Sequence, residues 1–244
     1  MAGSRTLSVE TLRVRHLSKR FGRIAALQDV SFSVHAGEVL GIIGPNGAGK
    51  TTLLECLAGT LASDAGSVDG GDGSALNSAG RLAKLFYLPD AISPWPSQTV
   101  RWALRFAAGF LRGRADEMDD IIRDLDLSAI LDQRIGTLSK GQRKRSVLAI
   151  GLLAPQPILV SDEPFDGLDL RQTRDVGAAL RRRAASGRTL VLSIHQIEDA
   201  SRVCDRFVLL SGGRVCGEGT VDELAARAGD ARGRDLAEVF LALT

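Results

Sequence analysis

The run from Gly44 to Thr52 limits the possible folds of this chain more than any other segment. It fits the pattern G-x-x-x-x-G-K-[ST], in which backbone N–H groups turn inward around a phosphate chain. It follows the apolar run Val39–Ile43 and precedes apolar residues at helical spacing. Strand, loop and helix in this order predict a phosphate site at a helix N-terminus. Its candidate nucleotide-binding residues are Gly44, Pro45, Asn46, Gly47, Ala48, Gly49, Lys50, Thr51 and Thr52.

Two side chains of this run suit a nucleoside triphosphate. Lys50 is placed to reach the β- and γ-phosphates, and the Thr51 hydroxyl is placed to ligate Mg²⁺. The alternative is a glycine-rich turn with an incidental lysine, and the flanking strand and helix disfavour it.

A second candidate site follows the apolar strand expected at residues 158–161. Asp162 and Glu163 come directly after it, and ligands bind at the carboxyl ends of strands in parallel sheets. Asp162 is placed to hold Mg²⁺, directly or through water, and Glu163 could polarise a water for attack on the γ-phosphate. In isolation, the two acids could equally cap the strand end.

Three further positions allow two interpretations each. Ser139, in the run Leu138–Gln142, is a good N-cap for a helix expected from Arg143 to about Leu153, and such a turn can also bind an anion. His195, after the strand expected at 189–194, is either structural or a hydrogen-bonding partner of the γ-phosphate. Phe21 is either a core ring or a stacking surface for a base.

Periodicity indicates a mixed α/β organisation. Residues 9–36 alternate as half-buried antiparallel strands do, and residues 97–134 predict two or three amphipathic helices. Residues 62–80 are rich in Gly, Ser, Asp and Asn, which favours turns and a hairpin over a core element. From residue 158 onward, strands and helices alternate, which predicts a parallel sheet. The triplet Arg143–Arg145 is expected to be a solvated face.

Composition narrows the class of protein. The chain has 244 residues, 44% of them hydrophobic and 25% charged, as in soluble globular proteins. A net charge of +2 does not indicate a nucleic-acid partner. The three cysteines lack metal-ligand spacing and are expected to be buried apolar residues. No apolar run approaches the length of a membrane span, so a membrane role would require a partner.

In order along the chain, these residues resemble the nucleotide-binding subunit of ABC (ATP-binding cassette) transporters. The resemblance places Phe21 at the adenine-stacking position, Asp90 at the Q-loop position and Leu138–Gln142 at the signature motif. It also places the D-loop at Phe165–Asp169 and the switch histidine at His195. It implies a phosphate-loop NTPase core with a parallel sheet, an antiparallel β subdomain and an inserted helical subdomain at about 91–138, within one ATPase domain (1–221) followed by a short tail (222–244).

The same resemblance implies that two subunits meet head to tail around two ATP molecules. Lys50, Glu163 and His195 would then be catalytic, and Thr51, Asp90 and Asp162 would hold Mg²⁺. The second subunit would contact the nucleotide through Ser139, Lys140, Gly141, Gln142 and Asp169.

Two positions depart from the family pattern. Asp90 replaces the usual Gln, and its shorter acidic side chain would contact Mg²⁺ through a water. Lys140 replaces the usual Gly, so that its charge lies near the partner's γ-phosphate or points to solvent. These departures resemble exporters whose membrane domain is a separate chain.

The resemblance therefore implies a cytoplasmic ATPase, peripheral on the cytoplasmic face of a membrane, that drives a separately encoded transmembrane permease. The expected direction of transport is export. The second ATPase subunit would form a homo- or heterodimer with it. The alternatives are a soluble ABC-type ATPase in cofactor assembly, a phosphate-loop small-molecule kinase, and a nucleotide-gated module without turnover. Neither the transported substrate nor its direction follows from these residues.

Overall fold

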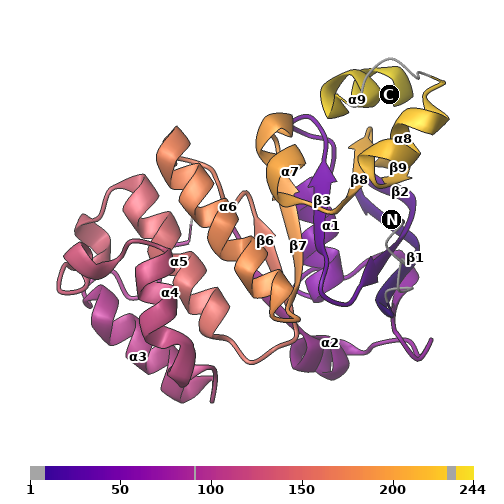
Figure 1. The fold of residues 1–244 in the computed structure, drawn as a ribbon. Helices are drawn as coiled ribbons and strands as arrows, with labels where there is room; N and C mark the ends of the chain where they lie inside the picture. The colour runs from indigo at the N-terminus through magenta and orange to yellow at the C-terminus, as the bar shows by residue number, and fades with distance from the viewer. Residues whose placement is uncertain (1–8, 91, 230–234) are drawn as a thin grey trace.

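The larger of two sheets forms the centre of the molecule in a computed structural model that describes residues 9–90, 92–229 and 235–244 (Figure 1). Its strand order is β5-β6-β7-β3-β8-β9; the strands from β5 to β8 run parallel, and β9 is antiparallel to β8. This confirms the predicted α/β class. The strands are β3 (Val39–Ile43), β5 (Leu85–Leu88), β6 (Ile158–Asp162), β7 (Thr189–Ile194), β8 (Arg206–Ser211) and β9 (Arg214–Gly219).

A smaller antiparallel sheet has the order β2-β1-β4 and confirms the expected β structure near the N-terminus. Its strands are β1 (Glu10–Phe21), β2 (Ile24–His35) and β4 (Ala65–Gly70). The alternating pattern places Val14 opposite Phe32, and both side chains are buried. This is the half-buried face that the period of two predicts.

Residues 62–80 contain the expected hairpin turn, around which Asp69 and Ala75 form an antiparallel bridge. They correct the rest of the expectation, because they also contain a core strand and the start of a helix. Strand β4 pairs with β1, and its Val68 is fully buried. Helix α2 (Ser78–Lys84) begins at Asn77, whose side chain accepts a hydrogen bond from the Gly80 N–H. Pairing with β1 therefore outweighs the turn-forming composition of the segment.

Two hydrophobic clusters cover the two faces of the central sheet. Alternate residues of β3 divide between them: Leu40 and Ile42 pack with the antiparallel sheet and helix α1 (Lys50–Ala58), whereas Val39 and Ile43 pack toward the opposite layer of helices. Such alternation is what a strand buried on both faces requires.

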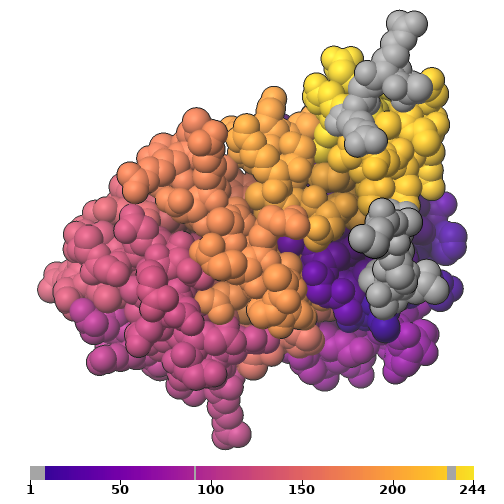
Figure 2. All heavy atoms as spheres, in the orientation of Figure 1, coloured from indigo at the N-terminus to yellow at the C-terminus, as the bar shows by residue number. Residues whose placement is uncertain are grey.

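A helical region forms one lobe of the molecule and confirms the amphipathic helices expected in residues 97–134 (Figures 1 and 2). Helices α3 (Val100–Phe110) and α4 (Met118–Asp124) pack on α5 (Lys140–Leu153) through apolar side chains such as Leu104 and Ile121. Short 3₁₀ turns lie at Ala115–Glu117, Ser128–Ile130 and Ile135–Thr137.

Helix α5 corrects two further expectations. It begins at Lys140, three residues before the expected start, because Ser139 and Gln142 form a capping box there. Its triplet 143–145 is not a solvated face. Arg145 is buried and donates to the carbonyl oxygens of Leu125 and Asp126, each at 2.8 Å. The spacing of apolar residues along the helix did not reveal that basic side chains of this triplet contact neighbouring segments of the chain.

The remaining helices cover the sheet and its C-terminal edge strand. Helices α6 (Leu170–Ala185) and α7 (Ile197–Val203) confirm the alternation expected after residue 158. Helices α8 (Val221–Arg227) and α9 (Leu236–Leu243) occupy the segment expected to be a tail, and they bury Leu224, Leu236 and Val239.

The predicted domain limits also include residues 1–8, 91 and 230–234, which lie outside the described residues. In the described part of the chain, no helix has both the length and the hydropathy needed to cross a membrane.

The three thiols are expected to differ in reactivity. Cys56 and Cys204 are buried, and burial raises the pKa of Cys56 to about 11 and that of Cys204 above its ordinary value. Cys216 is partly exposed. Because the thiolate is the reactive form, we expect one thiol to react rapidly with a disulfide reagent at pH 8, and all three to react in guanidinium chloride. Cys216→Ser should remove the rapid phase; rapid reaction of all three native thiols would contradict the packing around Cys56 and Cys204.

Candidate functional site

Three neighbouring strands of the central sheet end at the candidate site. Strand β3 leads into the glycine-rich loop, β6 ends at Asp162, and β7 is followed by His195. Strand β7 lies between β6 and β3 and is parallel to both. The topology therefore brings together residues that are more than a hundred positions apart in the sequence, at the edge where parallel sheets bind ligands.

The loop after β3 is held in a tight anion-binding shape. Gly49, the N-cap of α1, has a φ of 102°, and a Cβ there would lie 2.5 Å from the carbonyl oxygen of Ala26. The first helical hydrogen bond runs from the Leu53 N–H to the Gly49 carbonyl. The N–H groups of Lys50, Thr51 and Thr52 precede it at the helix start, where N–H groups lack an intrahelical acceptor. Free N–H groups at a helix start are suited to binding an anion such as phosphate.

Lys50 links this loop to the carboxylate after β6. Its buried ammonium donates to the carbonyl oxygen of Gly44 at 2.8 Å and lies 3.6 Å from Glu163 Oε1. The other Glu163 oxygen lies 2.7 Å from His195 Nδ1. Glu163 itself has a φ of 48°, a conformation that non-glycine residues rarely adopt. The structure therefore brings together Lys50, Glu163 and His195, the three predicted catalytic residues.

Asp162 has hydroxyl donors on both carboxylate oxygens. Thr51 Oγ1 donates to Asp162 Oδ2 at 2.7 Å, and Ser193 Oγ donates to Asp162 Oδ1. The carboxylate is almost fully buried. A hydroxyl and a carboxylate at this separation are the hard oxygen donors that Mg²⁺ takes beside substrate phosphates, so Thr51 and Asp162 fit this ion.

A pocket of about 570 Å³ runs from the antiparallel sheet to the phosphate loop. Its lining includes the apolar side chains of Phe21 and Ile24 and the polar side chains of Lys50, Thr51 and Glu163. Phe21 is 48% exposed, so its ring is not a core residue. Lys19 Nζ lies 5.6 Å from the ring centroid and contributes a cation–π contact. A lining with both an aromatic ring and a cationic side chain suits a base and a phosphate chain.

The residues predicted to contact a second subunit's nucleotide lie elsewhere. Among the described residues, the lining of the phosphate-loop pocket includes neither Asp169 nor the turn Ser139–Gly141 of the signature motif, called the signature turn below. Ser139 caps α5 and Asp169 caps α6, each through a capping box. The predicted trans contacts that share this separate location are Ser139, Lys140, Gly141, Gln142 and Asp169.

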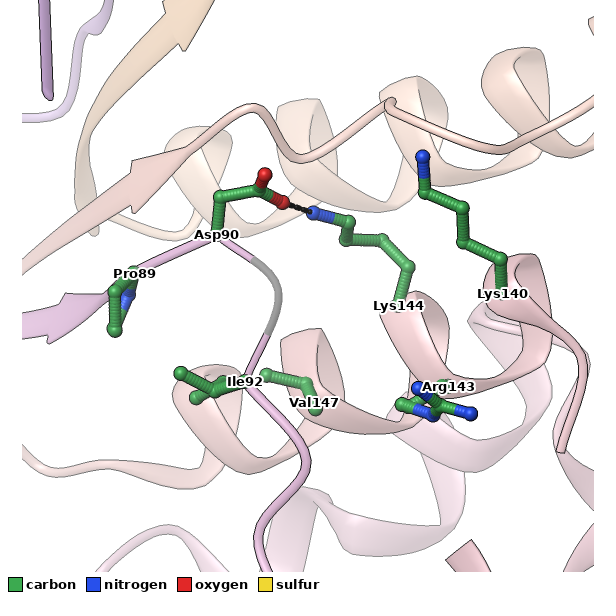
Figure 3. Close-up of a pocket in the computed structure, with 7 residues that line it drawn as sticks. All are labelled: Pro89, Asp90, Ile92, Lys140, Arg143, Lys144 and Val147. Carbon is green, nitrogen blue, oxygen red and sulfur yellow. Dashed lines mark hydrogen bonds and ion pairs between the residues drawn. The ribbon is translucent and has the colours of Figure 1, made fainter. Parts of the chain in front are cut away.

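Asp90 and Lys140, the two departures from the family pattern, each have an ion-pair partner. Lys144 Nζ lies 2.5 Å from Asp90 Oδ1, in a second pocket (Figure 3). Lys140 Nζ lies 2.6 Å from Asp166 Oδ2, and this hydrogen bond raises the pKa of Lys140. Asp90, predicted to hold Mg²⁺, lines this second pocket and not the one that contains Thr51.

Two functional contacts were missed by reasoning from the sequence. Ser193 is fully buried and joins both acids, since it donates to Asp162 and accepts a hydrogen bond from the Glu163 N–H at 2.9 Å. A serine in an otherwise apolar strand was the available signal. Gly212 and Gly213 line the phosphate-loop pocket from the β8–β9 turn, and their spacing matches no motif.

Tyr87 adds an electrostatic feature beside the acids. Burial raises the pKa of its phenol, and the negative charge of Asp162 raises it further. The phenol therefore stays neutral and adds no negative charge to that of the two acids. A glycine loop at one strand end, with acids at the end of a nearby strand, defines a phosphate-loop nucleoside triphosphatase.

Comparison with known proteins identifies the family. A family model described as "ABC transporter" matches residues 27–166. A hemin import ATP-binding protein of Bradyrhizobium diazoefficiens is 36% identical, with 88% of this chain and 85% of that protein covered. The Nod factor export ATP-binding protein I of Burkholderia lata is 34% identical, with 87% and 72% covered. The chain belongs to the ABC transporter family, among its ATP-binding proteins.

Other relatives agree. A putative ABC transporter ATP-binding protein of Treponema denticola is 33% identical over 213 residues, and the chain spans 43% of that protein's length. A solved ATP-binding subunit of an ABC transporter superimposes with a TM-score of 0.84 at 30% identity, covering 96% of this chain and 99% of that one. The ADP conformation of an ABC transporter cassette gives a TM-score of 0.77 at 25% identity, covering 95% and 98%. The protein is accordingly a nucleotide-binding ATPase with the cassette fold, as the resemblance predicted.

Proposed function

We propose that Glu163 is the residue that polarises the attacking water in ATP hydrolysis. Its carboxylate is held between His195 and Lys50, at 2.7 Å and 3.6 Å. This orientation leaves a negative group at the phosphate-loop pocket, where a general base must lie. Ser193 supports the position through the Glu163 backbone.

We further propose that Lys50 and the loop N–H groups bind the β- and γ-phosphates, while Thr51 and Asp162 hold Mg²⁺. When bound, this ion would neutralise charge that develops on the transferred phosphoryl group. Lys50 supplies positive charge from a rigid helix start. His195 orients Glu163 and donates or accepts a hydrogen bond near the γ-phosphate.

The observation that carries the proposed dimer is the separation of the predicted ATP contacts on one protomer. Among the described residues, the phosphate-loop pocket is lined by one cationic side chain, Lys50, and the signature turn lies outside that pocket. A second protomer, placed head to tail, would present its signature turn to the same nucleotide. This arrangement is favoured because the negative phosphates would then face positive or hydrogen-bond-donating groups from both protomers. We propose that residues 1–221 form this ATPase unit, that ATP binding closes the dimer, and that hydrolysis opens it.

The partner that we propose is a transmembrane permease encoded separately, with the ATPase peripheral on the cytoplasmic face. An exposed aromatic surface on the helical lobe supports a protein partner. Trp102 and Phe106 stack at 4.9 Å between ring centroids, Phe106 and Phe110 stack at 5.6 Å, and Trp95 packs edge-on against both Trp102 and Phe106. Exposed aromatic residues are typical of interfaces.

The direction that we propose is export. It is supported by Lys140 in the signature motif and by Asp90 at the Q-loop position, which resemble exporters with a separate membrane chain. Both an importer and an exporter protein are relatives at 36% and 34% identity. Measurements of uptake and efflux in vesicles that contain this protein and its permease would decide between import and export.

The experiment that tests the transport proposal pairs the protein with the permease of a neighbouring open reading frame in vesicles. We expect the permease to stimulate ATP hydrolysis at least several-fold. The double variant Trp102→Ala/Phe106→Ala should lose this stimulation and keep its basal rate, because these rings lie outside the phosphate-loop pocket. Leu241→Ala, an exposed apolar residue on α9, is the matched control. If no permease stimulates ATP hydrolysis and the protein instead binds a soluble partner, the cofactor-assembly alternative would be favoured.

Phe21 is expected to bind the adenine ring by stacking. Phe21→Ala should raise the KM for ATP several-fold with little change in kcat, since stacking stabilises ground state and transition state equally. A five-fold change corresponds to about 1 kcal/mol. Phe21→Trp, which keeps an aromatic face, should retain the wild-type KM. An unchanged KM for Phe21→Ala would show that the ring does not contact the base.

A further inference from the structure

The first turns of α5 carry two lysines, Lys140 and Lys144, which lie on one face because they are four residues apart. Each forms an ion pair with an acid from a different loop: Lys144 with Asp90 and Lys140 with Asp166. Asp90 follows β5, and Asp166 lies beyond the end of β6, the neighbouring strand. In Figure 3, Lys144 reaches Asp90 while Lys140 extends from the preceding turn.

The Lys144–Asp90 pair is shielded from water on the lysine side. The Lys144 side chain is 13% exposed, and the pocket around it, of about 350 Å³, includes the apolar residues Pro89, Ile92 and Val147. Charges interact more strongly where water is partly excluded. Removing one partner of such a pair leaves the other charge poorly compensated. This contact therefore constrains geometry more than an exposed ion pair would.

The Lys140 contact includes packing as well as charge. Gly167 has a φ of +80°, and a Cβ at this position would lie 2.6 Å from Lys140 Cδ. A Cβ on Gly141 would lie 3.0 Å from the Gly167 carbonyl oxygen. The start of α5 and the loop Phe165–Asp169 thus fit closely only with glycine at these two positions. The Lys140 stem covers the loop, and its ammonium reaches Asp166.

We propose that Lys140 and Lys144 are positioning residues for ATP hydrolysis. They tie the loops at Asp90 and Asp166 to the helix start that carries Ser139, so that the signature turn moves together with the ends of β5 and β6. In this arrangement the Asp90 carboxylate pairs with Lys144 and fixes the loop after β5 relative to α5. It is not a metal ligand. The inference rests on the proposed function, in which the signature turn meets the nucleotide of a second protomer.

The test is a charge exchange between Asp90 and Lys144. Lys144→Met and Asp90→Asn should each lower kcat about ten-fold while the KM for ATP stays within about two-fold, because neither residue lines the phosphate-loop pocket. The double variant Asp90→Lys/Lys144→Asp should recover to within about three-fold of the wild-type kcat, since the pair is restored with its polarity reversed. Arg123→Met, which breaks an exposed pair with Asp120 on α4, should hydrolyse ATP at the wild-type rate.

The second pair is tested with Lys140→Met and Lys140→Arg. Lys140→Met should lower kcat, and Lys140→Arg should restore most of it because the charge still reaches Asp166. Single variants with wild-type kcat, or a charge exchange no better than the single variants, would overturn the inference. So would losses of kcat that only follow losses of melting temperature. The proposed function is checked separately, by ATP hydrolysis in the wild-type protein and by ATP-dependent dimerisation of Glu163→Gln. If both are observed while the lysine variants behave like the wild type, the positioning role is wrong and the proposed function stands.

Discussion

Glu163→Gln is expected to abolish turnover and to trap an ATP-bound dimer. Glutamine keeps the size of the side chain and can still hydrogen-bond His195, but it loses the charge that faces Lys50 and cannot take a proton from water. General-base catalysis contributes about 10²–10⁴-fold, so kcat should fall by at least about a hundred-fold. ATP would still bind and would remain intact between the two protomers.

Phosphate release and light scattering after size-exclusion chromatography measure the two parts of this prediction. The variant should elute as a dimer with ATP and Mg²⁺ and as a monomer without nucleotide. Glu238→Gln, an exposed change on α9, is the matched control and should behave as the wild type does. Near wild-type turnover in Glu163→Gln would assign the base to another residue. A strictly monomeric protein with saturating ATP would refute the two-protomer site.

Lys50→Ala is expected to prevent ATP binding almost completely. The Lys50 ammonium is buried beside the phosphate loop and donates to the Gly44 carbonyl, so the substitution removes the site's central positive charge and a contact that shapes the loop. Hydrogen bonds between charged groups are about twice as strong as neutral ones. We expect the Kd for ATP to rise at least about a hundred-fold, which corresponds to about 3 kcal/mol.

Equilibrium titration with a fluorescent ATP analogue measures this loss. Lys84→Ala, at the end of α2 and outside the phosphate-loop pocket, controls for the loss of a lysine. Lys50→Arg separates charge from shape, because a guanidinium is planar and bulkier than an ammonium. It should bind ATP weakly. Binding by Lys50→Ala within two-fold of the wild type would contradict the assigned phosphate contact.

The fold was predictable where short-range pattern and strand burial agree. Strand β7 has the expected bounds, because its six residues are all buried and lie between clear breaks. The phosphate loop was predictable because the glycines of its motif stand at the positions where the backbone must turn around a phosphate. The core position of strand β4 was missed, although a hairpin was expected there. Its residues Ala65–Gly70 have low strand propensity and are stabilised by pairing with β1, which lies far away in the sequence.

The site was predictable in its parts but not in its pairings. The residues at the ends of β3, β6 and β7 could be chosen from motifs, and the parallel sheet explains why they meet. That Lys144 pairs with Asp90 could not be inferred, because a basic triplet on a helix is usually solvated. Ser193 was missed for a related reason: its two hydrogen bonds depend on the register between β6 and β7.

The capping box at Ser139 has a consequence for alanine scanning. Ser139 Oγ accepts a hydrogen bond from the Gln142 N–H, while its hydroxyl proton remains able to donate to a phosphate oxygen across the proposed interface. One oxygen atom can thus secure a helix within its own protomer and bind a ligand belonging to another. Truncating this residue would mix two losses in a single measurement, whereas aspartate would preserve the cap and repel the anion.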